Sequence, residues 1–281
     1  MNTPASAASL GALTSLRPSP RLPVLFLGHG SPMNALGGND YYQAWQALGS
    51  QFGQRYPKPQ LILCISAHWL THGWQLTAMA QPRTIHDFGG FPGELYEQQY
   101  PAPGAPVAAQ EISLALPEPP LGLDKHQWGL DHGAWAVLKP MFPAADIPVV
   151  QLSMDYSRPP AEHLALGQQL QGLRERGVLI VGSGNIVHNL RVMQAGASAK
   201  QAYDWALAFD QYVTEQVQRS DLAALADFQK LGRTAQMAHP TWEHYLPLLY
   251  AAGAAAPKDR VAFFNASFQA ASISMRSVIW S

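Results

Sequence analysis

Residues 61–69 read LILCISAHW, five apolar residues followed by a serine and, two positions later, a histidine. An apolar run this short and rich in Leu and Ile predicts a buried strand. Three further runs have the same character, at residues 22–27, 147–152 and 178–181. The chain therefore contains a set of strands that need cover on both faces.

Longer segments with helical spacing lie between these strands, at residues 41–52, 107–116, 133–141, 161–176, 202–218 and 242–252. Strands that alternate with helices predict an α/β sheet with helices on both faces. Two final runs, 261–266 and 272–280, predict antiparallel neighbours at one side of the sheet. The irregular stretch 83–106, rich in Gly, Pro and aromatic residues, has the length of a lid or a binding loop.

The composition excludes several classes of protein. Hydrophobic residues make up 47% of the 281 positions and charged residues 13%, which predicts one packed globular domain. Eighteen basic against 19 acidic residues, with no basic cluster, argue against nucleic acid as a partner. The single cysteine, Cys64, excludes an internal disulfide and a thiolate metal cage and fits a reducing, cytoplasmic setting.

No apolar run approaches the roughly 18 residues of a membrane-spanning helix, so we expect no membrane association. The first twenty residues are small and polar and lack the features of a secretory signal. We expect a flexible N-terminal extension over 1–20 and one catalytic domain over 21–281. No amphipathic helix or apolar run is spare for an interface, which leaves the oligomeric state open.

Three histidines follow directly on predicted strands. His29 lies in GHGSP at 28–32, His68 is the last residue but one of the stretch quoted above, and His188 comes shortly after the turn GSGN at 182–185. The carboxyl ends of strands in open α/β sheets are where ligands bind. A shared metal would satisfy all three imidazoles, each of which needs a partner when buried. With no cysteine ligand, the candidates are Zn(II) and non-haem Fe(II).

Two further segments carry candidate site histidines. His239, in AHPTWEH at 238–244, is a fourth candidate ligand at a helix start. His244 lies five positions later, and residues with this spacing do not share a helix face, so we expect only His239 to face the site. His132, in GLDHGAW at 129–135, is a candidate acid or hydrogen-bond donor. The alternative is that Asp131 or His132 simply caps the following helix.

Several motifs occur together and in order: GHGSPM at 28–33, SAHW at 66–69, IHDFGGFP at 85–92, LDHGAW at 130–135, and GSGN at 182–185 with HNL at 188–190. Over residues 22–280 the chain resembles the class III extradiol ring-cleaving dioxygenases of the DOPA 4,5-dioxygenase type. The resemblance implies a single three-layer αβα domain around a mixed, mostly parallel sheet.

The resemblance also implies one mononuclear divalent metal, held by His29, His68 and His239. His188 then acts either as the general base or as a fourth ligand. Ring-cleaving relatives outside this subgroup use a glutamate as third ligand, so His239 is a departure that leaves Fe(II) and Zn(II) both open.

The implied substrates are O2 and an aromatic diol, a DOPA-like or other substituted catechol, and the implied product is a ring-opened semialdehyde. A neutral imidazole is suited to take a proton from the catechol, and we assign this role to His188. His132 would steady the oxygen or protonate an intermediate. An aromatic wall for the ring would come from Trp69, His86, Phe88 and Phe91.

Two other functions use the same histidines. A zinc hydrolase would need a carboxylate base, for which Glu94 and Asp131 are candidates. A non-catalytic metal-binding protein of the same fold would keep the metal without ring cleavage.

Overall fold

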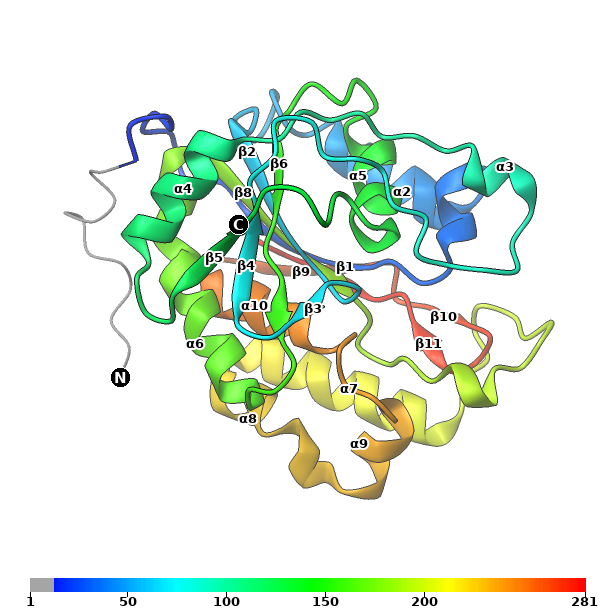
Figure 1. The fold of residues 1–281 in the computed structure, drawn as a ribbon. Coiled ribbons are helices and arrows are strands. Elements are labelled where there is room, and N and C mark those ends of the chain that lie inside the picture. Colours follow the sequence, from blue (N-terminus) through cyan, green and yellow to red (C-terminus); the bar gives the residue numbers. More distant parts are fainter. Residues whose placement is uncertain (1–12) are drawn as a thin grey trace.

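A computed structural model describes residues 13–281 and contains a central six-stranded sheet in the order β6-β2-β8-β1-β12-β9 (Figure 1). The first four strands are parallel to one another. β12 and β9 complete the sheet as antiparallel neighbours. The predicted mixed, mostly parallel sheet is confirmed, and so is the antiparallel pair at its side. The strand bounds are β1 Val24–Gly28, β2 Leu61–Ser66, β6 Val149–Gln151, β8 Val178–Gly184, β9 Val261–Phe264 and β12 Ser277–Trp280.

Successive strand residues point to opposite faces, and each face has its own hydrophobic core. In β2, Leu61, Leu63 and Ile65 belong to one core and Ile62 and Cys64 to the other. The first core is closed by α6 Pro160–Leu170, α7 Asp204–Arg219 and α10 Leu246–Ala254, and the second by α2 Asp40–Gly49 and α5 His132–Met141. The three-layer αβα architecture is confirmed (Figure 1).

Short elements surround this frame. Two parallel pairs, β3 with β7 and β4 with β5, were not predicted, because these strands are short and only partly apolar. The predicted helix over 161–176 is divided into α6 and a 3-10 segment, η2. The remaining bounds are β3 Leu70–Thr71, β4 Trp74–Thr77, β5 Leu121–Asp124, β7 Met154–Asp155, β10 Phe268–Gln269, β11 Ile273–Ser274, α3 Gly93–Tyr96, α4 Pro106–Ala115, α8 Leu222–Ala226, α9 Arg233–Ala238, η1 Pro32–Leu36, η2 Gln171–Arg176, η3 Leu190–Val192 and η4 Phe228–Leu231.

The expected N-terminal extension falls in two parts. Residues 1–12 lie outside the described residues. Leu13 and Leu16 are buried in the first core, and the Glu111 carboxylate of α4 accepts hydrogen bonds from Thr14 and Ser15. Residues 13–16 are therefore packed onto the domain, in contrast to the expectation. Within residues 13–281, no helix has the length and apolar character needed to cross a membrane.

The carboxyl-terminal end of β8 contains two glycines that bring another segment very close. A Cβ on Gly182 would collide with the Pro247 carbonyl, and one on Gly184 would collide with the carbonyl of His244. The start of α10 thus packs backbone to backbone against β8, which sets the distance between this strand end and residue 244.

We expect Gly182→Ala to lower the free energy of unfolding by about 1–3 kcal/mol, because the added methyl group overpacks this contact. Urea unfolding measures the change. Gly89→Ala is the control, since a Cβ there meets nothing within 4 Å, and it should change stability by no more than about 0.5 kcal/mol. Equal stability of the two variants would contradict the close-packing account.

Candidate active site

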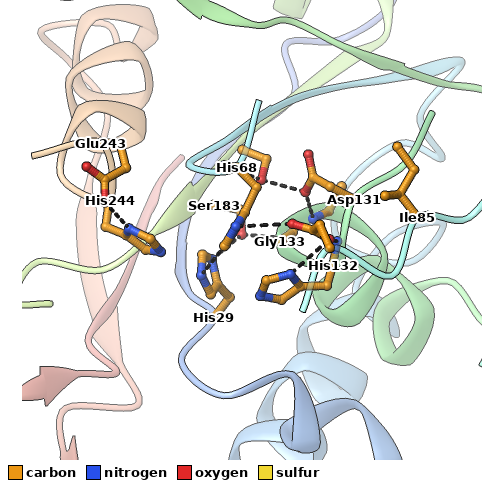
Figure 2. Close-up of polar contacts among 12 residues, drawn as sticks. His29, His68, Ile85, Asp131, His132, Gly133, Ser183, Glu243 and His244 are labelled. Carbon is orange, nitrogen blue, oxygen red and sulfur yellow. Dashed lines mark hydrogen bonds and ion pairs between the residues drawn. The ribbon is translucent and has the colours of Figure 1, made fainter. Parts of the chain in front are cut away.

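His29 and His68 leave the ends of β1 and β2 and face each other, with their Nε2 atoms 3.3 Å apart (Figure 2). The Nδ1 atom of His29 lies 3.0 Å from Ser183 Oγ, and this hydroxyl donates its own proton to the Gly133 carbonyl. Ser183 therefore accepts from His29. The Nδ1 atom of His68 lies 3.2 Å from Asp87 Oδ2.

His244 is the third imidazole of this group. Its Nδ1 atom lies 3.1 Å from Glu243 Oε1, and the ligand nitrogens of His29, His68 and His244 all lie within 4.8 Å of one another. The backbone N–H of Asn185 donates to the His244 carbonyl over 2.8 Å, at the close approach that Gly184 permits. The end of β8 thereby fixes His244 although this residue belongs to a distant part of the sequence.

The three imidazoles can share one tautomer. The Nδ1 atoms of His29 and His244 each hydrogen-bond to an oxygen, and that of His68 lies 3.2 Å from the Asp87 carboxylate, so a proton on each Nδ1 would leave each Nε2 free to bind a metal. Because the Nε2 atoms of His29 and His68 are 3.3 Å apart, one of the two must carry a proton in the metal-free protein, and a metal ion can take the place of that proton. Three neutral imidazoles held through their second nitrogen are the donor set of a Zn(II) or Fe(II) site. These side chains fit a metal ion.

Burial keeps most of this cluster uncharged. Desolvation, reinforced by the neighbouring histidines, holds the pKa of His29 and of His244 well below the ordinary value. Burial opposes the charging of His68 as well, but Asp87 and Asp131 outweigh it and raise the pKa of His68. The lone pairs of His29 and His244 are therefore available at neutral pH.

His132 lies beside these ligand candidates at the start of α5, with its ring 3.9 Å from that of His68 between centroids. Asp131 is the N-cap and accepts from the Ala134 N–H, so the capping role predicted as an alternative belongs to Asp131. The other partners of the Asp131 carboxylate are Ser66, Trp128 and Gln151. A carboxylate with four donors is a structural anchor and has little capacity left for a hydrolytic base.

His188 lies at the edge of the cluster. Its ring stacks on that of His244, with centroids 3.5 Å apart and planes at 10°. Its backbone N–H donates to the Ala238 carbonyl over 3.0 Å. Burial, followed by the field of nearby histidines, lowers the pKa of His188 to about 3, so the ring is unprotonated at neutral pH.

His239 does not join the other histidines, and the structure corrects its predicted position. It follows α9, its Nε2 donates to the Ile186 carbonyl over 2.7 Å, and its ring packs against Phe209 and Tyr245. The sequence predicts His239 and His244 on one helix, whereas the chain turns between α9 and α10 and separates them. A weak signal for His244 was present: Glu243 directly precedes it and supplies an acceptor.

The aromatic residues predicted to contact substrate lie in two places. Phe88 packs edge-on against His132 at 5.5 Å, with Phe91 and His86 beside it at 5.4 and 5.8 Å. Trp69 is stacked on Trp128 at 5.7 Å and is only 3% exposed. Glu94, the other base considered for a hydrolase, is exposed.

Comparison with known families matches residues 23–277 to the catalytic LigB subunit of aromatic ring-opening dioxygenase. The chain belongs to this family. The 4,5-DOPA dioxygenase extradiol of Escherichia coli strain K12 is 46% identical over 266 residues, covering 92% of this chain and 95% of that protein. The protein of the same name from Beta vulgaris is 35% identical over 247 residues, covering 86% and 90%.

A crystal structure of an uncharacterized protein from Escherichia coli K12 superposes with a TM-score of 0.80 at 40% identity, covering 93% of this chain and 100% of that one. The resemblance to extradiol dioxygenases of the DOPA 4,5-dioxygenase type is confirmed. This LigB-family protein is an extradiol aromatic ring-opening dioxygenase, and its family favours ring opening over the hydrolase and the non-catalytic alternative.

The buried neutral histidines predict acid sensitivity of the metal-free enzyme. His188 and His239 have pKa values lowered to about 3 and about 4, mainly by burial. Between pH 6.5 and 5 the unfolded chain binds protons at these positions and the folded chain does not. The free energy of unfolding therefore decreases as the pH is lowered, by on the order of 2 kcal/mol per imidazole at pH 5. His68, whose pKa is raised, works in the opposite direction. Urea unfolding at pH 7 and pH 5 measures the sum, and constant stability would contradict the neutral cluster.

Proposed function

We propose that this extradiol dioxygenase uses one divalent metal ion per chain, held by His29, His68 and His244, to open the ring of a catechol to a semialdehyde. The observation that carries the proposal is the shared geometry of the three imidazoles. Their Nδ1 atoms are anchored and their ligand nitrogens meet within 4.8 Å.

Fe(II) in this site would supply the electron transfer between the diol and O2 that Zn(II), which has no redox chemistry, does not support. The chain itself supplies three imidazoles, of which those of His29 and His244 are uncharged at neutral pH because burial lowers their pKa. It also removes water from the ring edges of His29 and His244, both of which are buried.

His188 is the proposed base for the catechol hydroxyl. It is unprotonated at neutral pH, and its stacking on His244 holds it next to a proposed metal ligand. A proton taken from the diol would stay on the ring while an anionic oxygen lies beside it, because an opposite charge favours the imidazolium. Because the His188 ring stacks on the His244 ring, it lies next to the proposed ligands. We therefore assign His188 the role of base in preference to that of a fourth ligand.

His132 is the proposed hydrogen-bond donor to oxygen or to the opening ring. Its position at the start of α5 is fixed from the backbone, because its N–H donates to Asp87 Oδ1 over 2.9 Å. Phe88 packs against the His132 ring and presents an aromatic surface to a flat substrate, with His86 and Phe91 behind it. Trp69, in its stack with Trp128, supports this region at a distance from Phe88.

DOPA-like catechols are the proposed substrate class, supported by the relatives named for DOPA. Apoprotein reconstituted with Fe(II) without air, and then given DOPA and air, is expected to consume O2 and form a yellow semialdehyde. The Zn(II)-loaded protein should show neither, and removal of the metal with a chelator should abolish both. Ring opening by the Zn(II) sample at the same rate, or no O2 uptake with any of several catechols, would contradict the proposal.

The choice of His244 over His239 is tested by a matched pair of variants. His244→Ala removes a proposed ligand and is expected to weaken Zn(II) binding by about 100-fold or more. His239→Gln retains a side-chain donor for the Ile186 carbonyl, and this variant should bind one equivalent of Zn(II) as tightly as the wild type. Chelator competition measures both affinities, and the reverse pattern would restore His239 as the ligand.

A further inference from the structure

Asp87 contacts two of the site histidines at once. Its Oδ2 lies 3.2 Å from the Nδ1 of His68, and its Oδ1 lies 3.0 Å from the Nδ1 of His132. The His132 backbone N–H donates to the same Oδ1 over 2.9 Å. The two ring contacts are short but do not have the geometry of hydrogen bonds, whereas the backbone N–H of His132 makes a hydrogen bond to Oδ1. One carboxylate therefore joins a proposed metal ligand to the proposed proton donor.

Hydrogen bonds hold the backbone that directly precedes Asp87 in place. The Ile85 N–H donates to the Leu130 carbonyl over 2.7 Å, and the Leu130 N–H donates to the Arg83 carbonyl over 2.8 Å. The Trp135 indole donates to the Ile85 carbonyl over 2.9 Å. These bonds attach the start of the irregular loop to the start of α5, so the carboxylate arrives between His68 and His132 with little freedom.

We propose that Asp87 is a positioning residue that orients His68 for the metal and His132 for the substrate as one unit. This inference rests on the proposed metal site. Because Asp87 precedes Phe88, which packs against His132, it also sets the place of the aromatic surface that faces the substrate. Removal of Asp87 should therefore damage two separable quantities, the affinity for the metal and the turnover of the metal-saturated enzyme.

Glu243 provides the matched comparison. It contacts His244 in the way that Asp87 contacts His68, but none of the contacts found for it within residues 13–281 is to His132. Glu243→Ala should weaken metal binding, and its loss of kcat at saturating metal should be smaller than that of Asp87→Asn, because Glu243 does not contact His132. Asp124 is the structural control, because its carboxylate accepts the backbone N–H groups of His126, Gln127 and Trp128 outside the site.

The test uses the full chain and Asp87→Asn, which keeps the shape of the side chain but replaces one accepting oxygen by a donor. We expect Zn(II) affinity, measured by chelator competition, to fall about 10- to 100-fold. We also expect kcat for DOPA to fall at least about 10-fold when Fe(II) is saturating. Asp124→Asn should lower the thermal midpoint and leave the Zn(II) affinity and kcat unchanged.

Asp87→Glu keeps the charge and displaces it by one methylene group. Its Zn(II) affinity and kcat should lie between those of Asp87→Asn and the wild type. It replaces Asp87→Asn in the test if circular dichroism shows that Asp87→Asn is unfolded.

Three outcomes would overturn the inference. The first is wild-type affinity and kcat in Asp87→Asn. The second is a loss of affinity alone, with kcat fully restored at saturating Fe(II), which would remove the link to His132. In both of these the proposed function stands. The third, a wild-type protein that binds no stoichiometric metal, would remove the proposed function together with the role of Asp87.

Discussion

The Nε2 atoms of His29 and His68 lie 3.3 Å apart and face each other, so the site holds either a proton or a metal ion between them. The parallel sheet creates the arrangement, because neighbouring strands end at the same edge and deliver a side chain each. β1 supplies His29 and β2 supplies His68, while β8 lies between these two strands and ends in the glycines that let His244 approach.

The anchors of the imidazoles explain how so many histidines are buried in one place. Ser183 and Glu243 hydrogen-bond to the Nδ1 atoms of His29 and His244, and the Asp87 carboxylate lies 3.2 Å from that of His68, so each ring has a partner that orients it. Together these rings bring three candidate ligand nitrogens within 4.8 Å of one another. Grouping several titratable side chains in a buried place does not favour folding by itself, and a bound ligand compensates for it. Such exceptions are typical of functional centres.

Much of the fold and part of the site could be predicted from the sequence. His29 and His68 followed from short apolar strands that end in Gly-His-Gly and Ser-Ala-His, since strand ends place side chains without knowledge of the rest of the fold. His244 could not be found in this way, because its position depends on the turn between α9 and α10 and on a backbone contact with Gly184. Asp87 was missed for a similar reason. Its loop has no periodic pattern, and tertiary hydrogen bonds alone decide where it lies.

Anomalous diffraction at the zinc edge, from crystals of the Zn(II)-loaded protein, shows whether His29, His68 and His244 converge on one metal ion. We expect a single strong peak within coordination distance of all three Nε2 atoms, with His239 still donating to Ile186. A peak coordinated by His239, or the absence of a peak among the three imidazoles at full metal loading, would contradict the proposed metal site.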